Sequence, residues 1–260
     1  MTLARIEDRG DHIAIINRNA AKRGALSVEY YEAVMAGFKA AQERRIRAVL
    51  LTSEGGFFCA GGDLTVLIER HKLPEDERHQ KIDALHDMIR AIRASPVPVV
   101  CAIEGGAAGA GLSIALACDL IVAAEDAKFT AAYVKAGLVP DGGLTSALAR
   151  AVPRQMAMEM CLLGRSLPVT RFAEAGVVTA LTAPGAADQA AADLVARLTA
   201  GPRDAQGVIR TLVADAYELS EEDQLAAEQI GMARAQGGAE AAEGIAAFLE
   251  KRPPRFGDLP

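Results

Sequence analysis

The chain has 260 residues, 51% of them apolar, and carries 28 basic against 34 acidic side chains, for a formal net charge of −6. This length is enough for a large hydrophobic core in one domain, and the lack of a basic block argues against a nucleic-acid partner. There is no signal-peptide pattern and no apolar run near the ~20 residues of a membrane span, so we expect a cytoplasmic protein without membrane contact. The four cysteines lack zinc spacing and lie among apolar residues, so we expect buried free thiols and no metal site.

Hydrophobic periodicity predicts strands alternating with helices in the first part of the chain. In chain order we expect a hairpin over residues 3–18, a helix from a Ser27 N-cap to about Arg44, a buried strand over 46–54 and, after a break at Pro74, a helix over 75–95 with Ile82, Leu85, Ile89 and Ile92 on one face. The helix over 75–95 is followed by a strand at 97–105, a short helix at 111–118, and strands at 119–125 and 127–131.

The character of the chain changes after residue 142. Residues 144–165 are helical with a break at Pro153, 176–183 form a last short strand, and the Ala-rich remainder is helical to about residue 252. This order predicts an α/β core over residues 1–183 and a helical C-terminal region over 184–260.

Three glycine-rich turns follow three of the predicted strands: GGFFCAGGDL at residues 55–64, GGAAGAG at 105–111 and AGLVPDGG at 136–143. Small residues let the backbone approach a ligand closely, and amides at a helix N-terminus bind negative charge. That charge could belong to a nucleotide's phosphates, or it could arise only during a reaction, when an amide pair forms an oxyanion hole.

The dinucleotide alternative rests on residues 105–111, which fit GxxxGxG. Three observations oppose it. A Rossmann fingerprint opens the first βα unit, whereas this motif lies a hundred residues into the chain. The helix that follows is too short for a crossover, and none of the four tyrosines is followed by lysine at the Tyr-x-x-x-Lys spacing.

The order of these motifs resembles the crotonase (enoyl-CoA hydratase/isomerase) superfamily. INRNAAKRGALS resembles its N-terminal signature, and FFCAGGDL matches F-x-A-G-x-D-L. IEGGAAGAGLSIALACDLIVAAEDAKF and AGLVPDGGLTSALARAV match the second and third signatures, so the resemblance covers essentially the whole chain. It implies a spiral of ββα units, a helical C-terminal region used in oligomerisation, and a homotrimer or dimer of trimers.

The resemblance also implies the substrate class and the site residues. The substrates are acyl-CoA thioesters, so coenzyme A is part of the substrate and no separate cofactor is expected. The two oxyanion donors fall on the backbone amides of Ala60 and Ala110, with Ala110 in place of the usual glycine. Contacts to the CoA moiety fall on Lys22, Arg23, Ala25, Ala60, Gly62, Asp63 and Leu64, and Gly24 stands where the family usually has Asn.

The carboxylates indicate which reaction to expect. Family hydratases share acid–base work between two glutamates, and those positions are Ser113 and Tyr133 here. Neither hydroxyl is a suitable base near pH 7, since a free tyrosine titrates near ~10. One carboxylate remains, Asp141 in GLVPDGG, at the place where isomerases of the family, including the phenylacetate-pathway ring-epoxide isomerase, have a catalytic aspartate.

Asp141 is therefore expected to be the base of an enoyl-CoA isomerase, or the N-cap of the following helix, and the two roles are compatible. Three alternatives remain open: an enoyl-CoA hydratase with an unusual acid, a thioester hydrolase, and a catalytically silent acyl-CoA-binding homologue. For Tyr133, a hydrogen bond to substrate and simple space filling are both left open.

Overall fold

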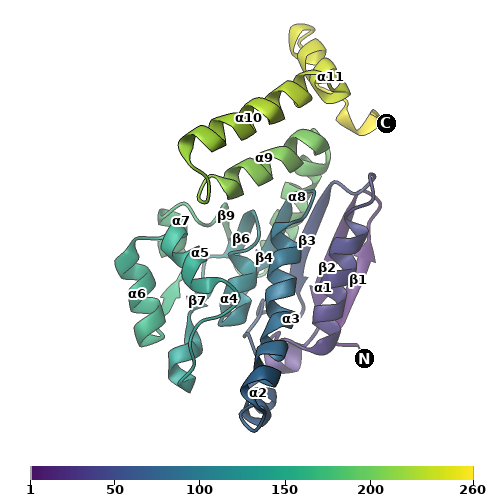
Figure 1. The fold of residues 1–260 in the computed structure, drawn as a ribbon. Helices are drawn as coiled ribbons and strands as arrows, with labels where there is room; N and C mark the ends of the chain where they lie inside the picture. The colour runs from purple at the N-terminus through teal and green to yellow at the C-terminus, as the bar shows by residue number, and fades with distance from the viewer. Residues whose placement is uncertain (1, 260) are drawn as a thin grey trace.

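The computed structural model describes residues 2–259, which form a large sheet, a smaller sheet and a helical C-terminal arm (Figure 1). The large sheet has the order β1-β2-β3-β4-β6-β9 and is parallel except for β1, which pairs antiparallel with β2. Its strands are β1 (Ala4–Asp8), β2 (His12–Asn17), β3 (Ala48–Ser53), β4 (Val99–Ile103), β6 (Leu120–Ala124) and β9 (Ala180–Thr182). Each lies within a strand predicted from the sequence, and the predicted α/β architecture is confirmed.

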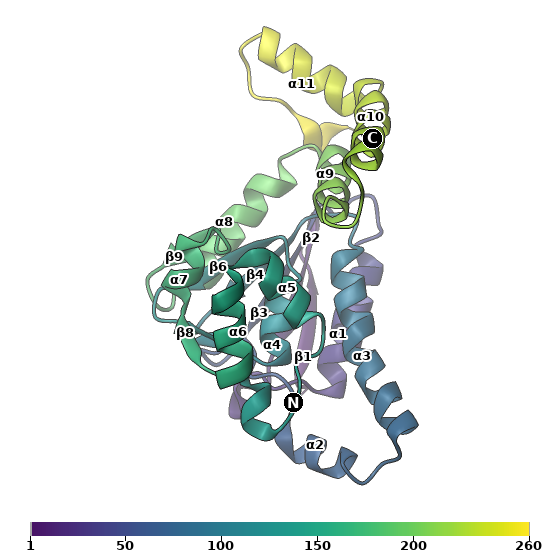
Figure 2. The ribbon, with the colours of Figure 1, turned by 60° about the vertical axis from the view of Figure 1, so that its left-hand side comes forward.

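Alternate residues of the central strands enter two different cores, as the two-residue period of a strand requires. Ile15, Leu51 and Cys101 pack into the core that includes α1 (Val28–Ala40) and α3 (Glu75–Arg93). On the opposite face, small side chains such as Ala14 and Ala102 pack against α8 (Ala187–Thr199). Figure 2 shows α1 and α3 on one side of the sheet and α8 on the other.

Helix α1 begins as predicted, because the Ser27 side chain accepts a hydrogen bond from the Tyr30 amide at 3.2 Å. It ends at Ala40 rather than at Arg44, since the chain must turn back to bury Ile46 at the start of β3. The predicted boundary at residue 183 stays a prediction; α8, the first helix beyond it, packs on the sheet.

The small sheet has the order β5-β7-β8, with strands β5 (Gly106–Ala108), β7 (Lys128–Thr130) and β8 (Ser166–Pro168). Only β7 was expected, because three-residue strands made of glycine, alanine or proline carry no periodic signal. Helix α4 (Ala110–Ala115) follows β5 directly and is short, as predicted.

The remaining helices of the core are α2 (Leu64–Arg70), α5 (Leu144–Ala151), α6 (Arg154–Leu163) and α7 (Val169–Glu174), with 3₁₀ turns η1 (Ala20–Lys22) and η2 (Ala132–Ala136). The break between α5 and α6 falls at Pro153, as predicted. Helices α2 and α7 were not predicted, because each is under two turns long and exposes much of its surface.

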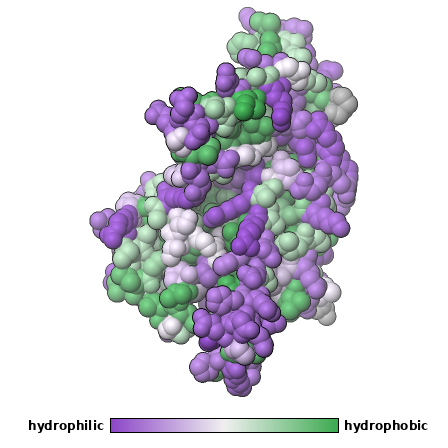
Figure 3. All heavy atoms as spheres, in the orientation of Figure 1, coloured by the Kyte–Doolittle hydropathy of each residue, from purple (hydrophilic) through white to green (hydrophobic). Residues whose placement is uncertain are grey.

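The C-terminal arm consists of α9 (Arg203–Asp215), α10 (Glu221–Gln236), α11 (Ala239–Leu249) and η3 (Phe256–Asp258). It stands away from the sheets in both ribbon views and exposes large apolar side chains, among them Ile230, Phe248 and Leu249. Figure 3 shows apolar patches on this arm and over α6, where Leu162 and Leu163 are also exposed. Between residues 2 and 259, no helix is both long and apolar enough to cross a bilayer.

Candidate active site

The first and second glycine turns lie in contact. Cys59 forms a parallel β-bridge with Ala107, and the Ala108 amide donates to the Cys59 carbonyl at 2.9 Å. A Cβ on Gly111 would lie 2.2 Å from that carbonyl, so the turns approach this closely only because Gly111 has no side chain. The sequence-predicted convergence of these two turns is therefore present.

The amide of Ala110 is one of two donors at this junction without an acceptor in residues 2–259. Ala110 is the first residue of α4, where the amide has no intrahelical partner and the helix dipole favours negative charge. A Cβ placed on Gly61 would lie 3.1 Å from the Ala110 nitrogen, so the backbone of the first turn passes directly beside this amide.

The prediction for Ala60 is wrong. Its amide donates to the Arg23 carbonyl at 3.0 Å and is therefore not available to a thioester oxygen. The amide of Gly62, two residues on, has no acceptor within the described part of the chain. The sequence could not distinguish these amides, because the choice depends on which of them the 22–25 segment engages.

Asp141, in the third turn, is held by the two residues that replace the family's glutamates. The Tyr133 hydroxyl, from η2, donates to the Asp141 carboxylate at 2.8 Å. The Ser113 hydroxyl, from α4, donates to the Asp141 backbone carbonyl at 3.0 Å. Burial, and then the neighbouring Asp141 carboxylate, raise the pKa of Tyr133 well above its ordinary range, so the phenol stays protonated and keeps donating.

The alternative role of Asp141 as a helix N-cap is wrong. The N-cap of α5 is Gly143, in the left-handed region, and no side chain caps the helix. The contact between Asp141 and the helix is made by its backbone carbonyl, which accepts from the Leu144 amide at 3.2 Å. The carboxylate is thus not occupied by helix amides.

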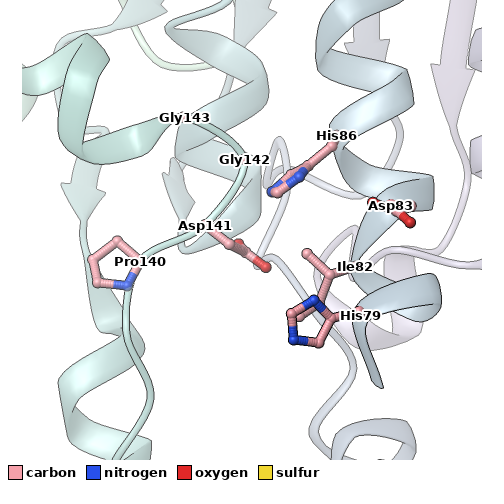
Figure 4. Close-up of a pocket in the computed structure, with 8 residues that line it drawn as sticks. All are labelled: His79, Ile82, Asp83, His86, Pro140, Asp141, Gly142 and Gly143. Atoms are coloured by element: carbon pink, nitrogen blue, oxygen red, sulfur yellow. The ribbon is translucent and has the colours of Figure 1, made fainter. Parts of the chain in front are cut away.

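A cavity of about 490 Å³ lies between this turn and α3. Its lining comprises His79, Ile82, Asp83 and His86 from α3, and Pro140, Asp141, Gly142 and Gly143 from the turn. Figure 4 shows the two imidazole rings and Ile82 on the side of α3 that faces Asp141, whereas the Asp83 carboxylate points away. A volume of this size suits a small organic ligand.

The sequence gave these histidines no role and placed Ile82 in the core. Ile82 is 36% exposed and lines the cavity instead, one turn before the buried Leu85. The signal that could have located this wall was the helical spacing of residues 79, 82, 83 and 86. No group of three or more His, Cys, Asp or Glu side chains in residues 2–259 is arranged to hold a metal.

The two segments expected to contact CoA lie side by side. The Leu26 amide donates to the Gly61 carbonyl at 2.8 Å, and Lys22 forms an ion pair of 2.5 Å with Asp63. Asp63 also caps α2 by accepting from the Thr65 amide at 2.9 Å. The Lys22 ammonium and then the Thr65 donors lower the pKa of Asp63 to about 2.

The other predicted contact residues are fixed along the same seam. The Asn19 side chain donates to the Ala25 carbonyl at 2.8 Å, and the Arg23 guanidinium lies 3.9 Å from the centre of the Phe57 ring. Gly24 has a φ of +70°, and a Cβ there would lie 2.5 Å from the Phe58 carbonyl, so an asparagine does not fit this backbone without a shift. Leu64 is 65% exposed beside this seam.

Comparison with known proteins gives consistent matches. The sequence model of the enoyl-CoA hydratase/isomerase family matches residues 9–259. A 1,2-epoxyphenylacetyl-CoA isomerase from Escherichia coli is 34% identical over 212 residues, covering 81% of this chain and 81% of that protein. The mitochondrial methylglutaconyl-CoA hydratase of Mus musculus is 32% identical over 256 residues, covering 96% of this chain and 80% of that protein. The crystal structure of an enoyl-CoA hydratase from Polaromonas sp. JS666 has a TM-score of 0.93 at 37% identity, covering 96% of this chain and 98% of that chain.

Proposed function

The chain belongs to the enoyl-CoA hydratase/isomerase family, and from this premise we propose that it is an enoyl-CoA isomerase with Asp141 as its single base. The observation that carries the proposal is the pair of hydrogen bonds from Ser113 and Tyr133 to Asp141. Both positions that hold a glutamate in the hydratase pattern carry instead a hydroxyl that orients this one carboxylate. A site of that kind favours chemistry that needs only one base.

A 1,3-shift of a double bond is such a reaction. Asp141 removes a proton from the carbon γ to the thioester carbonyl of a 3-enoyl-CoA, and the electron pair moves into a dienolate. The amides of Gly62 and Ala110 stabilise the negative charge on the thioester oxygen. The same proton returns from Asp141 to the α-carbon in the reverse direction, or the α-proton is taken and the γ-carbon protonated in the forward direction. The reaction is redox-neutral, and CoA takes part only as a portion of the substrate.

CoA binding is assigned to the seam between residues 22–25 and 62–64. The Lys22 and Arg23 cations are suited to the phosphates, and the Lys22–Asp63 ion pair holds the two segments together. Ala25, Gly62 and Leu64 supply small or apolar surface and backbone groups beside them. This arrangement places the thioester near the amides of the two glycine turns.

The second candidate is an enoyl-CoA hydratase, which is favoured by the names of several relatives, including the methylglutaconyl-CoA hydratase. A substrate panel distinguishes the candidates, including a thioester hydrolase and a silent acyl-CoA-binding protein. The purified protein is incubated with 3-enoyl-, 2-enoyl- and saturated acyl-CoA while enoyl-thioester absorbance and free thiol are followed. Rising absorbance from the 3-enoyl substrate alone supports the isomerase. Loss of absorbance from the 2-enoyl substrate supports the hydratase, thiol release the hydrolase, and no change the silent homologue.

A homotrimer or a dimer of trimers accompanies this proposal. The exposed apolar side chains of α9–α11, such as Val213, Ile230 and Phe248, would be covered in such an assembly. Sedimentation equilibrium at several concentrations tests it: a mass of three or six chains is expected, and a monomer would contradict it.

A further inference from the structure

One wall of the cavity is unusually polar for a site that handles a hydrocarbon chain. The imidazole of His86 extends from α3 toward Gly142 and Asp141, and His79 lies two turns earlier on the same side (Figure 4). Between them, Ile82 is the one apolar side chain that α3 gives to this wall. The wall therefore has a hydrogen-bonding group at each end and an apolar centre.

The two histidines differ in their surroundings. His79 is 73% exposed and lies 3.6 Å from Glu75, so it sits at the mouth of the cavity and faces solvent. His86 is partly buried and makes no hydrogen bond or ion pair within residues 2–259. Its two ring nitrogens are therefore free to bond to whatever fills the cavity.

The single-base reaction leaves this imidazole without a task. A double-bond shift in a hydrocarbon chain needs Asp141 and the two amides, and a plain alkyl group laid against His86 would desolvate its nitrogens without replacing their hydrogen bonds. Such a loss is avoided when the acyl group itself carries a hydrogen-bonding atom. Sites built to bond a polar atom discriminate strongly against ligands that lack it.

We infer that His86 is a specificity-determining residue that hydrogen-bonds an oxygen atom carried by the acyl group, so that the preferred substrate is an oxygen-bearing acyl-CoA rather than an unsubstituted one. This inference rests on the proposed function, because it takes the cavity beside Asp141 as the acyl site. It assigns Ile82 to the apolar part of the same acyl group and leaves His79 at the solvent edge.

The test measures binding of saturated thioesters, which the enzyme cannot isomerise. Isothermal titration calorimetry compares phenylacetyl-CoA with its 2-, 3- and 4-hydroxy derivatives, and hexanoyl-CoA with 6-hydroxyhexanoyl-CoA. At least one hydroxylated thioester is expected to bind the wild-type protein about 3- to 10-fold more tightly than its parent, the range of one neutral hydrogen bond. His86→Leu should abolish this preference, and His86→Gln, which keeps a donor and an acceptor, should retain part of it.

His79→Leu and Asp83→Asn serve as controls, since one side chain lies at the mouth and the other points away from the turn. Both should keep the preference. The inference is overturned if no hydroxylated thioester is preferred, or if His86→Leu leaves the preference intact. Binding of every thioester without discrimination overturns this inference alone, whereas binding of none overturns the proposed function with it.

Discussion

The Tyr133 hydroxyl donates a 2.8 Å hydrogen bond to the carboxylate of Asp141, eight residues further along the chain. The bond ties η2 to the third glycine turn and engages Oδ1 of the carboxylate. Since burial and Asp141 itself keep the Tyr133 pKa high, the phenol is a permanent donor across the working pH range. Tyr133 therefore positions the proposed base and does not act as a base itself.

Removing this donor should slow the reaction without abolishing binding. Tyr133→Phe is expected to lower kcat for 3-enoyl-CoA by about tenfold, because a carboxylate that loses one hydrogen bond worth on the order of 1 kcal/mol or more is less well oriented. KM should stay near the wild-type value. Tyr217→Phe, at a 62% exposed position on the C-terminal arm, is the matched control. An unchanged kcat in Tyr133→Phe would remove this residue from the account.

Alkaline pH should destabilise the fold through its buried phenols. Burial raises the pKa of Tyr31 to about 12, whereas a tyrosine in the unfolded chain titrates near ~10. The folded state keeps this proton longer, so the stability contribution is complete below pH ~10 and is lost as the pH rises from ~10 toward 12. Urea midpoints measured from pH 8 to 11 should therefore fall less steeply in Tyr31→Phe than in the wild type. Equal slopes in the two proteins would contradict this reading.

The amide of Ala110 can be removed with little change to the helix. Ala110 is the first residue of α4, a position that tolerates proline because its N–H is not used by the helix. Ala110→Pro should reduce kcat by about 10²–10³, the usual loss of one oxyanion donor. Glu221→Pro places the same residue at the first position of α10, remote from the cavity, and should leave kcat unchanged. Thermal unfolding of both variants separates loss of the donor from loss of the fold, and a folded Ala110→Pro variant with full activity would exclude this amide.

Lys22 should affect binding of CoA more than turnover. Its ammonium pairs with Asp63 at the seam between the two CoA segments, and a charge-assisted contact to phosphate of about 1.5–3 kcal/mol corresponds to a rise in KM of about 10- to 100-fold in Lys22→Ala. kcat at saturation should change little. Lys39→Ala, in the last turn of α1, is the control. A fall in kcat at unchanged KM would place Lys22 elsewhere in the mechanism.

The sequence predicted the fold well because its signals are periodic or motif-based. The crotonase-like fold expected from the three glycine turns is confirmed by the close superposition with a solved enoyl-CoA hydratase. The strands of the large sheet and the break at Pro153 follow from apolar runs and helix-breaking residues. β8 and α7 escaped prediction because tertiary packing, and not local preference, makes such short elements form.

The site was predicted less completely, for geometric reasons. Which amide of the first turn is free depends on the Arg23 carbonyl, which occupies Ala60 and leaves Gly62. That His86 faces Asp141 depends on how α3 packs against a turn 55 residues away, which no local pattern encodes. Asp141 itself was found because its turn matches a known motif.

The most direct test of the central claim is proton exchange at the α-carbon of a saturated acyl-CoA in D₂O, followed by NMR or mass spectrometry. Exchange needs only a base and an oxyanion site, so it does not depend on the natural acyl group. The wild-type protein and Asp83→Asn are expected to exchange the α-proton, and Asp141→Asn should be slower by about 10²–10⁴ while still binding the thioester. Exchange by Asp141→Asn at the wild-type rate would contradict the assignment of Asp141 as the base.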